Sequence, residues 1–123
     1  MDAFLTSQPI YVQLGDFIKK RIMRGELRPG DKLPSVRELA LEHKVNPNTV
    51  QRTYRELERE GVVEMRRGQG TFVVADEDIT GRLRETLKRQ HVTAFVRDMR
   101  EMGFSLREMQ ESVERLWEEG TDD

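Results

Sequence analysis

Apolar residues recur at helical spacing near the start of the chain. Between Ile10 and Arg24 they stand at positions 10, 14, 17, 18 and 22, the spacing of an amphipathic helix. Gly25 follows and is a suitable stop signal for that helix. Residues 27–34 contain two prolines and a Pro-Gly pair, so they predict a connector with a turn.

A capping box predicts the start of a second helix. The hydroxyl of Ser35 can cap free amides, and Glu38 stands three residues further on, as this motif requires. In such a helix Val36, Leu39 and Ala40 face inward.

A third helix is predicted after a turn at residues 44–47. Asn46 is a good N-cap, and Pro47 suits the first helical position, where its missing N–H costs nothing. The helix should run to about Glu60, where Gly61 ends it. The second and third helices together form a helix-turn-helix pattern.

The register of the third helix gives it two different faces. One face suits a core and carries Val50, Tyr54 and Leu57, with Thr53 between them. The other face is polar and carries Asn48, Gln51, Arg52 and Arg55. Asn, Gln and Arg along one face are suited to recognise base edges, and we call this surface the candidate reading face. An isolated helix whose polar face is only solvated would show the same residues.

A β-hairpin is predicted directly after this helix. Residues 62–65 and 71–74 are rich in β-forming side chains, and the segment RRGQG, residues 66–70, joins them. Its two glycines permit the positive φ angles of tight turns. A helix-turn-helix followed at once by a basic, glycine-rich hairpin is the layout of a winged-helix DNA-binding domain. This context favours base recognition over a merely solvated face for the third helix.

The remaining residues predict two more helices. The acidic triplet at residues 76–78 marks a boundary and a helix start. Apolar residues then recur every three or four positions and imply one long helix of about 24 residues. Gly103 stops it, and Ser105 with Glu108 forms a second capping box before a final helix.

Composition fits one domain with an accessory segment. The chain has 123 residues, 36% of them hydrophobic, and the predicted fold is mostly α with a small β-hairpin. We assign a winged helix-turn-helix domain to residues 1–75 and a two-helix dimerisation segment to residues 76–123. The absence of cysteine excludes disulfides and cysteine metal sites. No run of apolar residues spans a bilayer and no signal peptide is evident, so we expect a cytoplasmic protein without a membrane partner.

The net charge of −2 is unevenly distributed along the chain. Residues 1–75 carry 13 Lys and Arg against 10 Asp and Glu, a net of +3, and residues 76–123 carry 8 against 13, a net of −5. Phosphate binding needs a positive surface only locally, so the charge is compatible with double-stranded DNA as partner without arguing for it strongly.

The candidate DNA-binding residues lie in the helix-turn-helix and the hairpin. The second helix of such a motif enters the major groove, where Asn and Gln can bond adenine and Arg can bond guanine. Its N-terminus is expected to offer free N–H groups to a phosphate. The full set is Ser35, Arg37, Asn46, Asn48, Thr49, Gln51, Arg52, Arg55, Arg66, Arg67, Gly68, Gln69, Gly70 and Thr71.

Residues 9–74 closely resemble the DNA-binding domain of the GntR family of bacterial transcription regulators. Four segments carry the resemblance: PIYVQLGDFIKKRI, LRPGDKLPSVRELA, VNPNTVQRTYRELEREG and RRGQGTFV. The resemblance implies DNA contacts by Arg37, Asn48, Thr49 and Gln51, with Arg52 next, and a wing glycine at Gly68 between Arg67 and Gln69. Some members have an arginine where this chain has Pro47, so its operator preference should differ from theirs.

The tail is much shorter than the effector domain of most members. Only 48 residues follow Ala75, and this short helical tail resembles the YtrA subfamily. That resemblance implies a tail that serves dimerisation and a repressor of its own operon, which in the subfamily often encodes an ABC transporter. The operator, the regulated genes and any small-molecule effector are not defined by these residues.

Apolar stripes on the two tail helices predict a homodimer interface. Two such helices cannot bury both faces against each other, and pairing across a two-fold axis would cover the rest. The stripes could instead fold back onto the winged-helix core. The candidate interface residues are Leu83, Leu87, His91, Phe95, Met99, Met102, Met109, Val113, Leu116 and Trp117.

Three other functions find little support in the sequence. His43 and His91 have no second His or Cys nearby, so no metal or other cofactor is predicted. There is no P-loop, dinucleotide fingerprint, cysteine nucleophile or nucleophile elbow, so an enzyme is not predicted. The alternative from another class is a winged-helix protein-interaction module, which would not need a polar reading face beside a basic wing.

Overall fold

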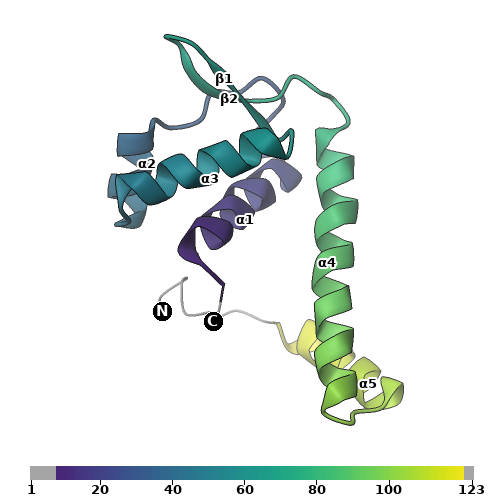
Figure 1. The fold of residues 1–123 in the computed structure, drawn as a ribbon. Coiled ribbons are helices and arrows are strands. Elements are labelled where there is room, and N and C mark those ends of the chain that lie inside the picture. Colours follow the sequence, from purple (N-terminus) through teal and green to yellow (C-terminus); the bar gives the residue numbers. More distant parts are fainter. Residues whose placement is uncertain (1–7, 121–123) are drawn as a thin grey trace. The chain divides into compact units, whose positions relative to one another are not determined.

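The computed structural model describes residues 8–120 and contains five helices and one hairpin in that range. The elements are α1 (Ile10–Met23), α2 (Val36–His43), α3 (Pro47–Arg59), β1 (Val63–Arg66), β2 (Gly70–Val73), α4 (Ile79–Glu101) and α5 (Leu106–Glu119), as Figure 1 shows. The predicted fold, mostly α with a small hairpin, is confirmed. In this part of the chain no helix is both long and apolar enough to cross a membrane.

Local capping chemistry fixes the ends of α2. The Ser35 hydroxyl accepts a hydrogen bond from the Glu38 amide at 3.0 Å, and the Glu38 carboxylate accepts one from the Ser35 amide at 2.8 Å. This is the predicted capping box. At the other end Lys44 adopts a left-handed conformation with φ of 56°, and this turn redirects the chain into α3.

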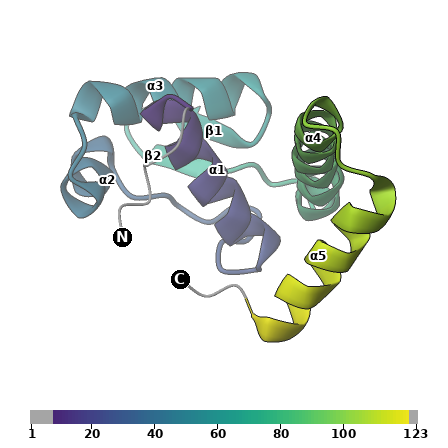
Figure 2. The ribbon, with the colours of Figure 1, turned by 90° about the horizontal axis from the view of Figure 1, so that it is seen from below.

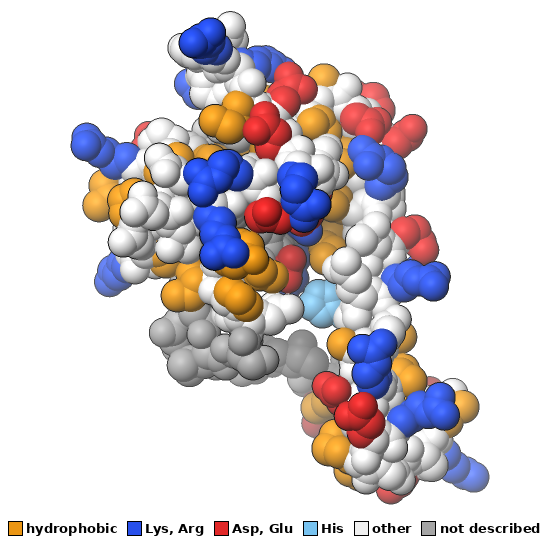
Figure 3. Space-filling model, in the orientation of Figure 1, with side chains coloured by type: hydrophobic (Ala, Val, Ile, Leu, Met, Phe, Trp, Pro, Cys, Tyr) orange, Lys and Arg blue, Asp and Glu red, His pale blue; other side chains and the backbone are white. Residues whose placement is uncertain are grey.

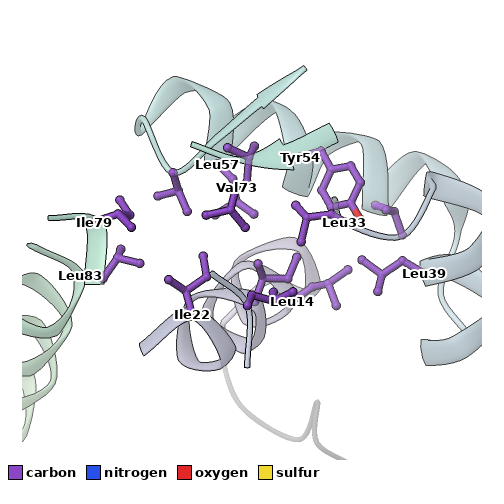
Figure 4. Packing of buried hydrophobic residues seen from close by; sticks show 14 of the residues in the cluster. Leu14, Ile22, Leu33, Leu39, Tyr54, Leu57, Val73, Ile79 and Leu83 are labelled. Atoms are coloured by element: carbon purple, nitrogen blue, oxygen red, sulfur yellow. The ribbon is translucent and has the colours of Figure 1, made fainter. Parts of the chain in front are cut away.

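One hydrophobic core joins α1, α2, α3 and the hairpin, and Figure 4 shows it from close by. The apolar face predicted for α3 is buried in it, with Val50, Tyr54 and Leu57 at most 2% exposed. The Tyr54 hydroxyl donates a hydrogen bond of 2.6 Å to the carbonyl oxygen of Pro34, and burial raises the pKa of this tyrosine. α3 is therefore anchored on one face, which leaves the opposite face exposed.

The hairpin has a third segment along its second edge. β1 and β2 pair antiparallel, with Val63 opposite Val73, and each strand lies one residue away from its predicted bounds. Lys32, in the connector before α2, forms a β-bridge with Phe72. The amide of Leu33 also donates to the carbonyl of Thr71 at 2.8 Å. These contacts attach the hairpin to the helix-turn-helix.

Two compact units divide the chain between Arg84 and Glu85. This division lies nine residues after the boundary expected from the acidic triplet. The difference arises because Ile79 and Leu83, on the first turns of α4, are 1% and 6% exposed and belong to the core of the first unit. Leu83, a member of the candidate dimer set, is thus buried within its own chain.

The second unit contains the rest of α4 and α5, and it buries very little of itself. Among its described residues only Leu87 and Met109 are buried apolar side chains. The predicted capping box at Ser105 and Glu108 is present. Figure 2, which looks along α4, shows α5 running away from the end of α4 instead of lying along its side.

Apolar side chains therefore remain exposed on both helices of this unit. Trp117 is 84% exposed and Phe95 is 40% exposed. The other exposed large apolar residues of this unit are Val92, Met102, Phe104, Leu106, Val113 and Leu116.

Candidate nucleic-acid interface

The predicted polar face of α3 lies on the surface. Asn48, Gln51, Arg52 and Arg55 are all exposed, on the side of α3 opposite its buried residues. Figure 3 shows Lys and Arg side chains over α3 and at the tip of the hairpin. The register inferred from the sequence thus places the candidate reading residues together.

The N-terminus of α3 differs from the expectation of free N–H groups. The side-chain oxygen of Asn46 accepts a hydrogen bond from the Asn48 amide at 2.7 Å, and the backbone carbonyl of Asn46 accepts from the Thr49 amide at 2.9 Å. Pro47 has no N–H. The expectation was wrong because the N-cap itself uses these donors, and Asn46 has a structural task in addition to any contact with DNA.

Thr53 connects α3 to α1 beside this face, and Thr49 lies one turn before it on α3. The Thr53 hydroxyl lies 3.0 Å from the carbonyl oxygen of Tyr11 and 3.0 Å from that of Thr49. Thr49 is half-buried, so its side chain is less accessible than those of its neighbours on the polar face.

An aromatic ring that sequence reasoning missed supports Arg52. The guanidinium carbon of Arg52 lies 3.8 Å from the centroid of the Tyr11 ring, a cation–π contact. Tyr11 stands in the second position of α1, far from α3 in the sequence. No periodicity could have revealed this contact, although an aromatic residue off the apolar stripe of the predicted first helix was a possible signal.

Ser35 and Arg37 lie at the start of α2. The Ser35 hydroxyl is engaged in the capping box, as an acceptor, and its own proton can still be donated. Arg37 is exposed in the first turn of α2. Within residues 8–120 it takes part in no ion pair, as is also the case for Arg55 and Arg67.

The hairpin places its basic residues in different environments. Arg66 lies with its guanidinium carbon 4.0 Å from the centroid of Phe72 and donates to Glu64 at 2.9 Å. The turn residues Arg67, Gly68 and Gln69 are exposed. The side chain of Arg66 thus stabilises the hairpin, and the tip is the accessible part.

Gly70 and Thr71 have structural roles at the base of the tip. Gly70 has φ of +124°, and a Cβ atom there would lie 2.9 Å from Cε of Lys32. The conformation favours glycine, whereas the end of the flexible lysine side chain could move aside. Thr71 is 8% exposed, so its side chain is buried.

Acidic side chains gather in the C-terminal half of α3, where Glu56 stands one turn after the candidate residue Arg52. Glu56 accepts a hydrogen bond of 2.8 Å from Arg59, which holds the pKa of Glu56 below its ordinary value. Glu60 pairs with Lys19 at 2.7 Å. These acids are partly neutralised by neighbours, and the N-terminal half of α3 carries no acidic side chain.

No alternative chemistry assembles around the two histidines. His43 is half-buried, with its ring centroid 4.7 Å from that of Phe17, and His91 is exposed on α4. Among residues 8–120, no group of three or more His, Cys, Asp or Glu side chains is placed to hold a metal ion.

An exposed polar helix on a helix-turn-helix, with a basic hairpin attached beside it, defines the winged helix-turn-helix class of DNA-binding proteins. The chain matches the family described as bacterial regulatory proteins, gntR family, over residues 10–73. It therefore belongs to the GntR family of transcription regulators, which bind DNA and are not enzymes.

Full-length relatives define the subfamily. The chain is 51% identical over 117 residues to the uncharacterized HTH-type transcriptional regulator YhcF of Bacillus subtilis, a match covering 95% of this chain and 97% of that protein. It is 38% identical over 114 residues to the HTH-type transcriptional repressor YtrA of the same organism, covering 90% of this chain and 86% of YtrA. The chain is thus of the YtrA-like type, as predicted.

A solved structure agrees with the same assignment. A GntR family transcriptional regulator from Listeria monocytogenes superimposes with a TM-score of 0.80 at 35% sequence identity. The superposition covers 91% of this chain and 98% of that chain, so the similarity extends beyond the winged helix into the tail.

Proposed function

We propose that this DNA-binding regulator is a homodimeric repressor that recognises an inverted-repeat operator. The observation that carries the proposal is the contrast between a winged helix that buries its own core and a helical tail that leaves its apolar side chains exposed. Two copies joined by their tails present two recognition helices, and a two-fold protein matches a two-fold operator.

Each recognition helix inserts the N-terminal half of α3 into a major groove. Asn48 and Gln51 suit adenine, and Arg52 and Arg55 suit guanine or a phosphate. Arg37 and Ser35 contact the sugar-phosphate backbone next to the helix, and the tip residues Arg67, Gly68 and Gln69 contact the backbone or a minor groove. This arrangement uses the basic side chains that form no ion pair within the described residues.

The charges of the tail helices favour pairing between two copies. α4 carries six Lys and Arg against three Asp and Glu, a net of +3, and α5 carries two Arg against five Glu, a net of −3. α5 does not lie along α4 of its own chain (Figure 2), so both helices are available to a second copy. Opposite charges then steer the association and the apolar residues, including Phe95 and Trp117, supply the buried area.

Repression follows from occupancy of the operator, which excludes RNA polymerase from the promoter. The printed name of YtrA identifies that relative as a repressor, and its similarity to this chain covers both the winged helix and the tail. Control of the protein's own operon, with a transporter among its genes, is the corresponding proposal for the target. Such an activity takes place in the cytoplasm.

Fluorescence anisotropy with labelled duplex from upstream of the protein's own gene tests this function. We expect tight binding that is selective against a scrambled duplex and weakens steeply as salt rises. Equal, weak binding to both duplexes would contradict recognition of that region. No binding even at low salt would favour a protein-interaction module instead.

A further inference from the structure

Arg52 is the only residue of the candidate reading face for which the described part of the structure shows a cation–π contact. Its guanidinium carbon lies 3.8 Å from the centroid of the Tyr11 ring. A long arginine side chain in solvent samples many rotamers, and ordering it costs conformational entropy when it binds. A stacked guanidinium already samples fewer rotamers, so the side chain loses less conformational entropy when it binds DNA.

The backbone at Tyr11 is held against the helix that carries Arg52. The Thr53 hydroxyl contacts the carbonyl oxygen of Tyr11 at 3.0 Å and so connects the start of α1 to α3. Close packing one turn further along α1 adds to this attachment, since a Cβ atom on Gly15 would lie 3.7 Å from Leu57 and 3.8 Å from Thr53. The two backbone positions that carry the ring and the arginine therefore stay next to each other as long as α1 and α3 stay packed.

A competing partner for Arg52 is already engaged. Glu56 stands one turn after Arg52 on α3, the spacing at which an arginine and a carboxylate pair. Arg59 donates two hydrogen bonds, of 2.8 and 3.2 Å, to one oxygen of that carboxylate, Oε1, while Arg52 acts on Glu56 only through its charge. Within residues 8–120 Arg52 forms no ion pair, and the N–H groups along its edge stay available as donors.

Arg66 shows what the alternative arrangement looks like. It also lies over an aromatic ring, 4.0 Å from the centroid of Phe72, but its Nε donates to Glu64 at 2.9 Å. Both arginines therefore stack on an aromatic ring, but the guanidinium of Arg66 is paired with a carboxylate and that of Arg52 is not. Stacking leaves the edge of a guanidinium free, and that edge is the part that bonds guanine bidentately.

We propose that Tyr11 is a positioning residue for base recognition: it holds the Arg52 guanidinium in the orientation that reads a guanine of the operator. This inference rests on the proposed DNA-binding role of Arg52. Tyr11 acts through Arg52, so its loss lowers the discrimination between correct and altered operators more than it lowers nonspecific binding.

Anisotropy on three kinds of duplex tests the proposal: the operator, a set of copies in which one candidate guanine each is replaced, and a scrambled sequence. Tyr11→Leu removes the π face and retains an apolar side chain, and Tyr11→Phe is the matched control that keeps the ring. We expect Tyr11→Leu to weaken operator binding about two- to fivefold, with binding to the scrambled duplex unchanged and Tyr11→Phe equal to the parent. An unchanged specificity ratio in Tyr11→Leu would overturn the proposal.

A double-mutant cycle separates positioning from a contact made by Tyr11 itself. In an Arg52→Ala background the Tyr11→Leu change should have no further effect on operator binding. An equal loss in both backgrounds would show that Tyr11 acts independently of Arg52 and would contradict the proposal.

A measurement without DNA keeps this inference distinct from the proposed function. Ring-current shifts of the Arg52 side-chain protons in the free protein report the stacking directly by NMR. They should be present in the parent and in Tyr11→Phe, and absent in Tyr11→Leu. If the parent shows the shifts and binds no DNA, the proposed function fails; if it binds selectively without the shifts, the role of Tyr11 fails.

Discussion

The winged-helix unit and the tail unit are both built from capped helices, yet they differ in how much apolar surface they bury. The first unit contains a continuous cluster of fifteen buried hydrophobic residues, from Leu14 on α1 to Leu83 on α4. Among its described residues the second buries two apolar side chains, Leu87 and Met109, and leaves Trp117 84% exposed. An amphipathic helix is stable in water when its apolar face is covered.

The difference separates two tasks along one short chain. The winged helix completes its core internally, so its outer face can be polar and serve DNA. The tail does not complete a core by itself. We propose that a second copy of the chain covers its exposed apolar side chains. Because the two units obtain their stability differently, substitutions in each should respond differently to protein concentration.

One leucine-to-alanine change in each unit gives the largest expected contrast. Leu57→Ala empties a site that is 2% exposed and should lower the free energy of unfolding by about 2–5 kcal/mol at any protein concentration. Leu116, which is 53% exposed in the single chain, should respond differently. Leu116→Ala should have an effect that depends on protein concentration, because it acts through association.

Urea unfolding of both variants at several protein concentrations measures this contrast. A concentration-independent loss in Leu116→Ala as large as that in Leu57→Ala would remove the distinction between the two units.

A charge on the tail's apolar stripe should have the next largest effect. Phe95→Glu places a carboxylate at a position that is 40% exposed in the single chain and buried in the proposed dimer. Burying an unpaired carboxylate costs several kcal/mol, so we expect dimerisation to weaken by about a hundredfold or more. Sedimentation velocity reports the change.

Thr86→Glu is the matched control for that experiment. It adds the same charge to α4 nine residues earlier, on the opposite side of the helix, where Thr86 is exposed. An unchanged dimer in Phe95→Glu, or equal disruption by both variants, would exclude the stripe as the interface.

Arginine removal from the winged helix should affect DNA binding and leave the tail unaffected. Arg52→Ala should weaken operator binding by about 1–3 kcal/mol and relax the preference for one base pair. Arg67→Ala should weaken binding to all duplexes and reduce the salt dependence by about one phosphate contact. Anisotropy and sedimentation on the same samples check both parts; operator binding at parental strength would show that the residue is not part of the interface.

The smallest expected effect concerns the cap of α2. The hydrogen bond from the Ser35 amide holds the pKa of the Glu38 carboxyl below its ordinary value. Because the pKa is lower in the folded state, the stabilisation is complete above the unfolded pKa of about 4.3 and is lost as the pH falls through the folded value.

Urea unfolding of Glu38→Gln between about pH 7 and pH 3 tests this dependence. The variant should lack this part of the acid destabilisation, whereas Glu42→Gln, outside the capping box on the same helix, should retain it. An identical pH profile in Glu38→Gln and the parent would show that the cap contributes nothing to acid sensitivity.

Helices and caps could be predicted from the sequence because their causes are local. Ser35 with Glu38 and Asn46 with Pro47 act within one turn, and the structure contains both caps. The buried and polar faces of α3 follow from helical period alone. The expectation of free N–H groups at the N-terminus of α3 was wrong, however, because the side-chain oxygen that makes Asn46 a good cap also accepts a hydrogen bond from one of these amides.

Contacts between distant segments could not be predicted. The strands lie one residue from their expected positions, and the bridge from Lys32 to Phe72 is a pairing that no local pattern reveals. The acidic triplet signals a boundary locally, yet Ile79 joins the first unit through contacts far away in the sequence. Tyr11 was missed for the same reason, since its partner lies on α3.

Binding to an intact operator compared with a single half-site tests the central claim most directly. Anisotropy with both duplexes should be measured for the parent and for Phe95→Glu at one salt concentration. If the tail joins two reading units, the parent binds the intact inverted repeat far more tightly than the half-site, and Phe95→Glu loses that advantage while binding the half-site as the parent does. A parent protein that binds both duplexes equally well would contradict the account.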